Sequence, residues 1–121
     1  MVKKISYNEI KELFFPLPKT IISAPQYEYY AVFDGDKAVS MGAVHNDRVH
    51  CLYTPTRFRG LGYCTELMHY IVENKLAHNA LCTADSYEIF LKCGFCLKKV
   101  IHRQNSKGEK YILWEVDYGT T

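Results

Sequence analysis

The chain has 121 residues, the usual size of a single domain with one hydrophobic core. Hydrophobic residues make up 48% of it and charged residues 23%, which is ordinary for a globular protein and excludes a low-complexity chain. The net charge of +2 argues neither for nor against a nucleic-acid partner.

No apolar run reaches the length that spans a membrane, so we expect no membrane partner. The first residues, Met1-Val2-Lys3-Lys4, lead into a polar helix and lack the apolar stretch of a signal peptide. Five cysteines, an odd number, are expected to remain reduced thiols. These features together predict a cytoplasmic protein.

The first half of the chain predicts a helix followed by a three-stranded meander. Ser6 and Glu9 have the spacing of a capping box, and Pro16 and Pro18 end the short helix behind it. Strands are predicted at residues 27–33, 37–45 and 48–54, separated by Asp-Gly and Asn-Asp turns. Apolar side chains then recur at helical spacing, which predicts a helix from about residue 63 to about 78.

The second half predicts a strand, a helix and a hairpin. A short apolar strand at residues 80–83 precedes a helix with Asp85 or Ser86 as its N-cap and Gly94 just past its end. Residues 95–103 and 111–118 form the predicted hairpin. Strands that first meander and then alternate with helices predict an α/β (α+β) fold: a mixed, mostly antiparallel central sheet with helices on both faces.

The segment from Arg57 to Met68 has the pattern of an anion-binding loop. It closes a predicted strand, crosses Gly60 and Gly62, and opens the predicted long helix. The two glycines allow a turn that points successive N–H groups one way, and the first helical turn adds unpaired N–H groups and a positive dipole end. A phosphate or pyrophosphate is therefore the expected ligand. The spacing excludes both the P-loop and the dinucleotide-binding fingerprint.

This loop resembles the acyl-CoA loop of the GNAT-type N-acetyltransferases, which follows Arg/Gln-x-x-Gly-x-Gly/Ala. In one register Arg57, Gly60 and Gly62 match the motif in full. In another, Arg59 and Gly62 match it, and Cys64 stands where the family has glycine or alanine. We prefer the second register, because residues 58–68 then resemble the family's Tyr-Arg-Gly-Lys-Gly-Tyr-Ala-Thr-x-Leu-Leu. Residues 52–55 resemble the strand that precedes it, and residues 90–95 resemble the family's downstream Tyr-x-Lys-x-Gly-Phe.

The resemblance implies one acyl-CoA N-acyltransferase domain over residues 1–121, with a shortened N-terminal region. Acetyl-CoA would be the acyl donor and a primary amine the acceptor. The amine would attack the thioester directly. The pyrophosphate would lie on the N–H groups of the loop and the pantetheine beside the strand that ends at Tyr53. The cofactor-binding residues implied in this way are Leu52, Tyr53, Thr54, Arg59, Gly60, Leu61, Gly62, Tyr63, Cys64 and Thr65.

The catalytic residues depart from the family pattern. Phe90 stands where the family has its general acid tyrosine, and a phenyl ring donates no proton. Tyr87, three residues earlier and on roughly the same helix face, is the expected substitute. His50 is the expected proton acceptor, because histidine titrates near neutral pH and strand alternation places it on the same face as Leu52 and Thr54. No metal is expected.

About 25 residues precede the meander, which is short for a family that places a strand and two helices there. An open acceptor side follows from this length. It suits a protein side chain, a chain terminus or another bulky amine, or a homodimer in which the partner completes the wall.

Three alternatives remain open at this point. Cys93 and Cys96 form a Cys-x-x-Cys, which indicates a redox pair or half of a zinc site with Cys82 and a histidine. The basic residues of the C-terminal hairpin indicate a nucleic-acid-binding module or a docking surface for such an acceptor. Phe90 also fits a degenerate protein that binds CoA without turnover.

Overall fold

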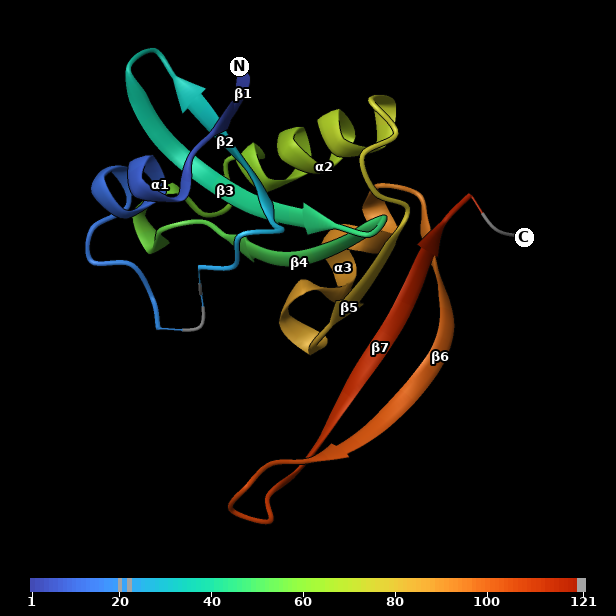
Figure 1. The fold of residues 1–121 in the computed structure, drawn as a ribbon. Coiled ribbons are helices and arrows are strands. Elements are labelled where there is room, and N and C mark those ends of the chain that lie inside the picture. The colour runs from blue at the N-terminus through green and yellow to red at the C-terminus, as the bar shows by residue number, and fades with distance from the viewer. Residues whose placement is uncertain (20, 22, 120–121) are drawn as a thin grey trace.

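The fold is a single seven-stranded sheet with helices on both sides (Figure 1). This computed structural model describes residues 1–19, 21 and 23–119. The strands lie in the order β1-β2-β3-β4-β5-β7-β6, and every neighbouring pair is antiparallel except β4 with β5. Their bounds are β1 Val2–Ile5, β2 Glu28–Asp34, β3 Lys37–His45, β4 Arg48–Tyr53, β5 Asn79–Cys82, β6 Phe95–Gln104 and β7 Lys110–Tyr118. The predicted fold class is confirmed.

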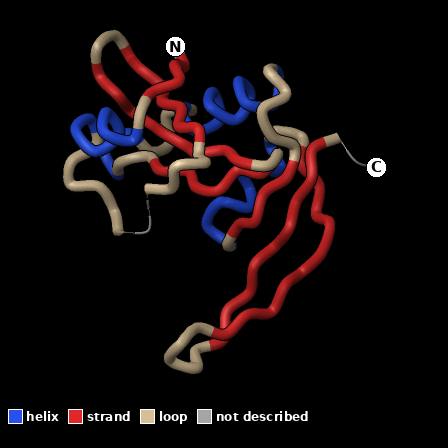
Figure 2. The backbone as a smooth tube through the Cα atoms, in the orientation of Figure 1, coloured by secondary structure: helices blue, strands red, loops and turns tan. Residues whose placement is uncertain are grey.

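Among the described residues, three α-helices cover the sheet from both sides: α1 (Tyr7–Leu13), α2 (Tyr63–Glu73) and α3 (Ala84–Lys92). A short 3-10 helix, η1 (Thr56–Phe58), precedes α2. Helix α1 packs on one face, which we call the α1 face, while α2 and α3 pack on the other, the α2/α3 face (Figure 2). No helix in the described part of the chain is long and apolar enough to cross a membrane.

Each face has its own hydrophobic core. On the α2/α3 face, Leu67, Met68 and Ile71 of α2 are fully buried against the sheet. These three residues belong to the helical stripe that the sequence predicts. On the α1 face, Ile10 and Phe14 are buried against β2 and β3.

The meander agrees closely with its predicted bounds, but β1 was not predicted. The predicted capping box is present, since Ser6 Oγ accepts the Glu9 N–H at 3.2 Å and the Glu9 carboxylate accepts the Ser6 N–H at 3.1 Å. In front of it, β1 pairs with β2 as an edge strand of only four residues. Its two central lysines are exposed, which is typical of a sheet edge and obscures a strand pattern in the sequence.

Two predicted helix boundaries are wrong. Helix α2 ends at Glu73, several residues before the predicted end, because Lys75 adopts a left-handed backbone with φ of 54° although no glycine marks the site. Helix α3 begins at Ala84 with Thr83 as its N-cap residue. The predicted N-cap residues, Asp85 and Ser86, lie two and three residues later, inside the helix. The predicted end is confirmed, since Gly94 follows α3 with φ of 93°.

The parallel pair β4 and β5 touches only at one end. Arg48 lies opposite Asn79 and Val49 lies opposite Ala80, and beyond these two pairs the strands separate. The turn between β3 and β4 holds the start of β5 beside Arg48. The Asp47 carbonyl oxygen accepts hydrogen bonds from the N–H groups of His78 and Asn79, both at 3.1 Å. The two strands therefore form a V that is closed at Arg48 and open at Tyr53.

A buried polar network holds the closed end of the V. The Asn79 amide donates to the carboxylates of Glu115, at 2.9 Å, and Asp117, and its oxygen accepts a hydrogen bond from Arg48 Nε at 2.6 Å. Arg48 also pairs with Glu115 at 3.3 Å, and Lys98 approaches both carboxylates. Glu115 and Asp117 are 7% and 6% exposed, so Asn79 separates and satisfies two buried acids.

We expect Asn79→Ala to lower the free energy of unfolding by about 2–4 kcal/mol, because it leaves two buried carboxylates and one arginine without their shared partner. Chemical denaturation of both proteins measures the difference. The matched control is Asn74→Ala, which removes an amide that bonds Tyr70 at the exposed end of α2. A loss at Asn79 no larger than that at Asn74 would show that the network does not stabilise the V.

Candidate functional site

The loop between β4 and α2 has the backbone that the glycine pattern predicts. Gly60 and Gly62 have φ of 79° and 88°, in the left-handed region, and Gly62 is the N-cap residue of α2. A Cβ atom on either glycine would meet nothing within 4 Å. The glycines are therefore required by the backbone turn, and the space above them is open to a ligand.

The loop forms one wall of a pocket of about 830 Å³. Every residue that the sequence assigns to the cofactor lines this pocket except Leu61, whose side chain is 64% exposed to solvent. The structure adds four further lining residues: Phe58 beside the loop, and Ser86, Ile89 and Lys92 from α3. We call this pocket the cradle.

The cradle is positive where an anion would sit. Arg59 Nε donates to the Thr54 carbonyl oxygen at 2.8 Å, which fixes the guanidinium at the rim with further N–H groups available. Lys92 adds a second cation from α3, and the N-terminus of α2 adds its dipole. Arg57 instead lies over the Phe58 ring, 4.7 Å from its centroid, and does not line the cradle. The pocket thus includes the arginine of the preferred register.

Two side chains of the first turn of α2, Tyr63 and Cys64, have environments that affect the loop. The Tyr63 hydroxyl donates to the Asp34 carboxylate at 3.0 Å, and this hydrogen bond raises the pKa of Tyr63. Burial raises the pKa of Cys64 to about 11, so its thiol stays protonated at neutral pH. Cys64 is therefore a neutral wall residue and adds no negative charge to the cradle.

A second pocket, of about 240 Å³, lies between the separating strands. We call it the splay pocket. Its walls come from β4 with His50 and Leu52, from the end of β5 with Cys82, and from the start of α3 with Thr83 and Ser86. Leu52 and Ser86 line both pockets, so the splay pocket adjoins the cradle.

The face assigned to His50 from strand alternation is wrong. Cys51 lies opposite Ala43 and Val49 opposite Val44, so His50 is an extra residue in β4, a β-bulge. Leu52 packs on the α2/α3 face, whereas the His50 ring stacks on Tyr27, a residue of the α1 face, with centroids 4.7 Å apart. The bulge breaks the period of two on which the assignment depended.

The hydrogen bonds of His50 define its neutral tautomer. Nε2 lies 3.1 Å from the His45 carbonyl oxygen, and because a carbonyl only accepts, Nε2 carries the hydrogen. The lone pair is therefore on Nδ1, where the Tyr27 hydroxyl lies at 3.4 Å. His50 also lines the splay pocket.

The residues around Phe90 are arranged differently from expectation. Phe90 is buried and packs on Phe95, with ring centroids 5.2 Å apart. The Tyr87 ring lies on Trp114, at 4.6 Å between centroids, and Tyr87 is not among the residues that line either pocket. Ser86 lies one turn before Phe90 and faces both pockets.

Sequence reasoning missed the contribution of α3 to the cradle. Ser86, Ile89 and Lys92 recur every three residues, a spacing that places them along one side of a helix. This signal is present in the sequence, but it has meaning only once α3 is known to lie opposite the glycine loop.

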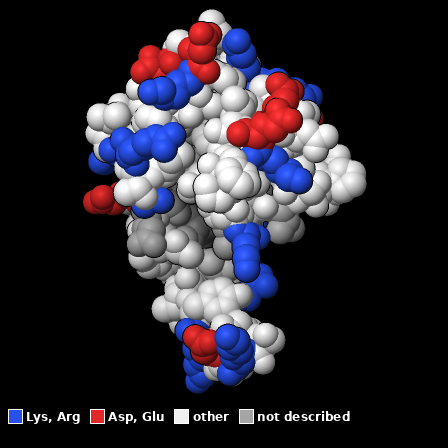
Figure 3. Space-filling view, turned by 90° about the vertical axis from the view of Figure 1, so that its left-hand side faces the viewer, with Lys and Arg blue, Asp and Glu red and all other residues white. Residues whose placement is uncertain are grey.

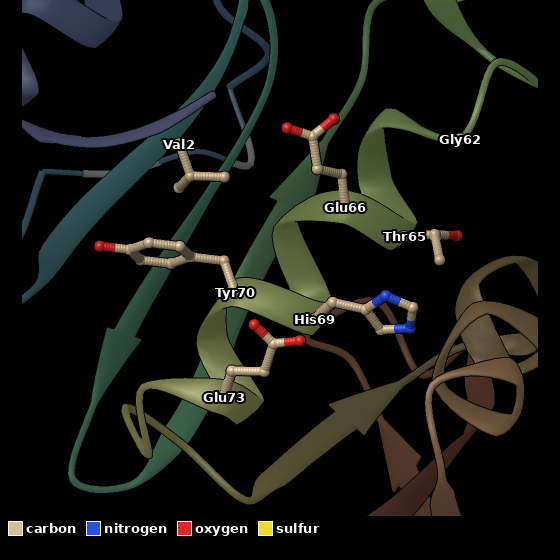
Figure 4. Close-up of a pocket in the computed structure, with 7 residues that line it drawn as sticks. All are labelled: Val2, Gly62, Thr65, Glu66, His69, Tyr70 and Glu73. Atoms are coloured by element: carbon tan, nitrogen blue, oxygen red, sulfur yellow. The ribbon is translucent and has the colours of Figure 1, made fainter.

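Another groove lies on the outer side of α2 and has the opposite charge. Glu66, Tyr70 and Glu73 lie along the side of the helix that faces Val2 (Figure 4). The two carboxylates disfavour an anion there. Of these two sites beside α2, only the cradle suits a pyrophosphate.

The cysteines provide no metal centre among the described residues. No group of three His, Cys, Asp or Glu side chains there is arranged to hold an ion. Cys93 is buried at the end of α3 while Cys96 is exposed on β6, and all five cysteines are free thiols. The zinc alternative therefore lacks a ligand set in this part of the chain.

Comparison with solved structures decides the fold family. The IAA acetyltransferase from Bacillus cereus ATCC 14579 superposes with a TM-score of 0.71 at 11% identity, over 98% of this chain and 97% of that one. An acetyltransferase from Bacillus subtilis, solved in complex with CoA, matches with a TM-score of 0.71 at 11% identity, over 99% and 98%. This chain has the GNAT fold.

The matching structures also include the ribosomal-protein-S18-alanine N-acetyltransferase from Escherichia coli, with a TM-score of 0.66 at 8% identity, over 98% of this chain and 92% of that one. Comparison of the sequence with family models and with curated proteins finds no match. The GNAT fold is thus visible in the backbone at sequence identities near one residue in ten.

We expect the thiols to react in an order set by burial. Burial raises the pKa of Cys51, Cys64 and Cys82 to about 11 each, so at pH 8 only about 0.1% of such a thiol is the reactive thiolate. The exposed Cys96 should react with iodoacetamide at least about tenfold faster than Cys64. Mass spectrometry of the labelled peptides measures both rates.

The control is the same reaction in denaturant, where all five thiols should react alike. Labelling of Cys64 as fast as Cys96 in the folded protein would contradict a buried, neutral Cys64 in the cradle wall.

Proposed function

We propose that this protein is an acyl-CoA N-acyltransferase that transfers the acetyl group of acetyl-CoA to an amine. The observation that carries the proposal is the V between β4 and β5, which opens directly beside the positive glycine loop. An extended thiol-bearing chain that ends in a pyrophosphate matches both parts at once. The CoA complex of a structure with the same fold supports this interpretation.

The loop N–H groups would hold the pyrophosphate, with Arg59 and Lys92 as its cations. Beyond Val49 the β4 edge that faces β5 is unpaired, so the backbone groups of Leu52 and Tyr53 are available to pair with the pantetheine. An N–H group on that edge would also stabilise the thioester oxygen as it becomes negative.

The reaction needs an unprotonated amine close to the thioester carbonyl carbon. The amine nitrogen forms the new C–N bond, the C–S bond breaks, the amine loses a proton and the CoA thiolate gains one. We propose that His50 accepts the amine proton at Nδ1, because His50 lines the splay pocket and Nδ1 is the ring nitrogen that carries the lone pair when Nε2 donates to the His45 carbonyl oxygen.

A hydroxyl on the first turn of α3 would stabilise the departing thiolate. Tyr87 is the residue that the sequence favours, and Ser86 is the residue that the position favours, because Ser86 lines both pockets. A hydrogen bond to sulfur from Ser86 would replace the proton donor that Phe90 lacks.

An amine on a polypeptide is the acceptor that the open architecture suits best. Between α1 and β2 there is no second helix in the described residues 14–19, 21 and 23–27, and Ile21 is the residue of this segment that lines the splay pocket. The alanine acceptor named for one GNAT neighbour is an amine of this kind. A second candidate function, CoA binding without turnover, is favoured by one observation, the burial of Phe90 in place of a tyrosine.

We expect the wild-type protein to bind acetyl-CoA at one site and the Gly62→Glu variant to bind at least about 100-fold more weakly, because the new carboxylate repels the pyrophosphate. Calorimetric titration measures both. Gly62→Gln is the matched control, since it imposes the same strain at positive φ and nearly the same volume without the charge. Equal weakening in both variants would point to a distorted loop, and absence of binding by the folded wild type would sink the proposal.

Among the candidate proton-transfer residues, we expect His50→Gln and Ser86→Ala to lower kcat by about 100-fold and about tenfold, with little change in the affinity for acetyl-CoA. Tyr87→Phe should change kcat least, because its ring packs on Trp114. Steady-state rates of CoA release over pH measure these effects. A larger loss at Tyr87 than at Ser86 would assign the donor to Tyr87.

A further inference from the structure

Strand β7 has an edge that nothing in the described part of the chain covers. β5 pairs with β7 only through Asn79–Cys82, opposite Asp117 to Trp114, and then turns away into α3. The earlier residues of β7, from Lys110 to Leu113, pair with β6 alone. We call these four residues the free β7 edge. In Figures 1 and 2 the β6–β7 hairpin runs well past the end of β5.

The free β7 edge leads into the splay pocket. Leu113 lines that pocket together with Leu81, Cys82 and Thr83 at the end of β5. A strand added to this edge would occupy the sheet position that β5 leaves empty. One end of such a strand would therefore reach the place where the proposed reaction needs its amine.

The chemistry of the edge suits an extended polypeptide. A strand with one neighbour presents unpaired N–H and C=O groups on its other side, which pair best with another backbone. Tyr111 is 43% exposed and Ile112 is 48% exposed, and because successive residues alternate, they project on opposite faces. An added strand would find an apolar cross-strand neighbour on each face.

Charge decides what kind of polypeptide fits. Five residues between 98 and 110 are Lys or Arg and one is Glu. Lys98 and Lys99 approach the buried carboxylates of β7, whereas Arg103, Lys107 and Lys110 form no ion pair among the described residues. Figure 3 shows the resulting cluster of basic side chains around one acidic residue at the hairpin tip. The tip therefore favours an acidic segment.

We propose that the free β7 edge binds an extended acidic polypeptide segment as an added strand, antiparallel to β7, and so delivers its leading amine to the splay pocket. The direction follows from β5, which is itself antiparallel to β7 and ends at Cys82. A segment that continues β5 in the same direction has its N-terminus at the splay pocket and its later residues at the basic tip. This inference rests on the proposed function and names the acceptor class for the same site.

Trp114 provides a direct readout of binding. It is the only tryptophan in the chain and occupies the last β7 position that β5 covers, next to the free edge. The probe is a pool of hexapeptides with a free N-terminus and glutamate at the fourth and sixth positions. Titrated in saturating CoA, it should change the Trp114 fluorescence saturably.

Two matched peptide pools separate backbone pairing from charge. A pool with N-methyl groups at its second, third and fourth amides keeps the charge but loses strand hydrogen bonds, and it should bind at least about tenfold more weakly. A pool with lysine in place of glutamate should weaken by a similar factor. Because only the ligand changes, protein folding does not affect these comparisons.

A protein variant tests the tip. The single variants Arg103→Glu and Lys110→Glu should each bind the acidic pool more weakly, and the double variant at least about tenfold more weakly, while Lys11→Glu, the same charge change as either single variant on the exposed end of α1, should bind as the wild type. Circular dichroism confirms that each variant is folded.

The outcomes separate this inference from the function on which it rests. Acetyl-CoA binding in calorimetry without any response to the acidic pool up to about 1 mM would overturn the strand-addition site and leave the acyltransferase proposal intact. Peptide binding without acetyl-CoA binding would overturn the acyltransferase proposal and leave the strand-addition site intact. Equal affinity for the N-methylated pool, displacement of the acidic pool by an oligonucleotide, or a dimer in sedimentation that excludes the peptide would each overturn the added strand.

Discussion

The limited contact between β4 and β5 is the constraint on which the rest of the structure depends. Two residue pairs join the strands, and the Arg48–Asn79–Glu115–Asp117 network holds that end closed in the core. Because β5 is anchored there and turns into α3 soon afterwards, the strands separate along β4. Backbone groups that a regular sheet would pair are left facing a pocket, and α3 is directed across the mouth of the glycine loop.

Charge is divided between the two sides of α2 in a way that supports the site. The cradle side has the helix N-terminus, Arg59 and Lys92, whereas Glu66 and Glu73 lie on the outer side. Burial keeps the Cys64 thiol neutral between them, with its pKa raised to about 11. Of the two sides of α2, only the cradle side thereby favours an anion, and that side adjoins the V.

The departures from the sequence prediction lie around the splay pocket. Phe90 fills a core position, Ser86 presents a hydroxyl one turn earlier, and the bulge at His50 turns its ring toward Tyr27 on the α1 face. The long hairpin presents an open edge beside the same pocket. The glycine-loop side of the candidate site thus agrees with the sequence prediction, while the β4 bulge and the start of α3 differ from it.

Local patterns in the sequence were enough for the capping box at Ser6, the meander, the glycine loop and the hairpin, because each depends on neighbouring residues and on fixed backbone preferences. Three features were not predicted: the strand Val2–Ile5, the end of α2 at Glu73 and the bulge at His50. The strand and the bulge depend on pairing partners far along the chain, and α2 ends because Lys75 is left-handed. The sequence also contained the Ser86, Ile89 and Lys92 spacing, but only the packing of α3 against the loop made it part of a site. Interactions between residues close in the sequence determine most of the helices, strands and the glycine loop. The tertiary structure decides which side chains from different elements lie together in the site.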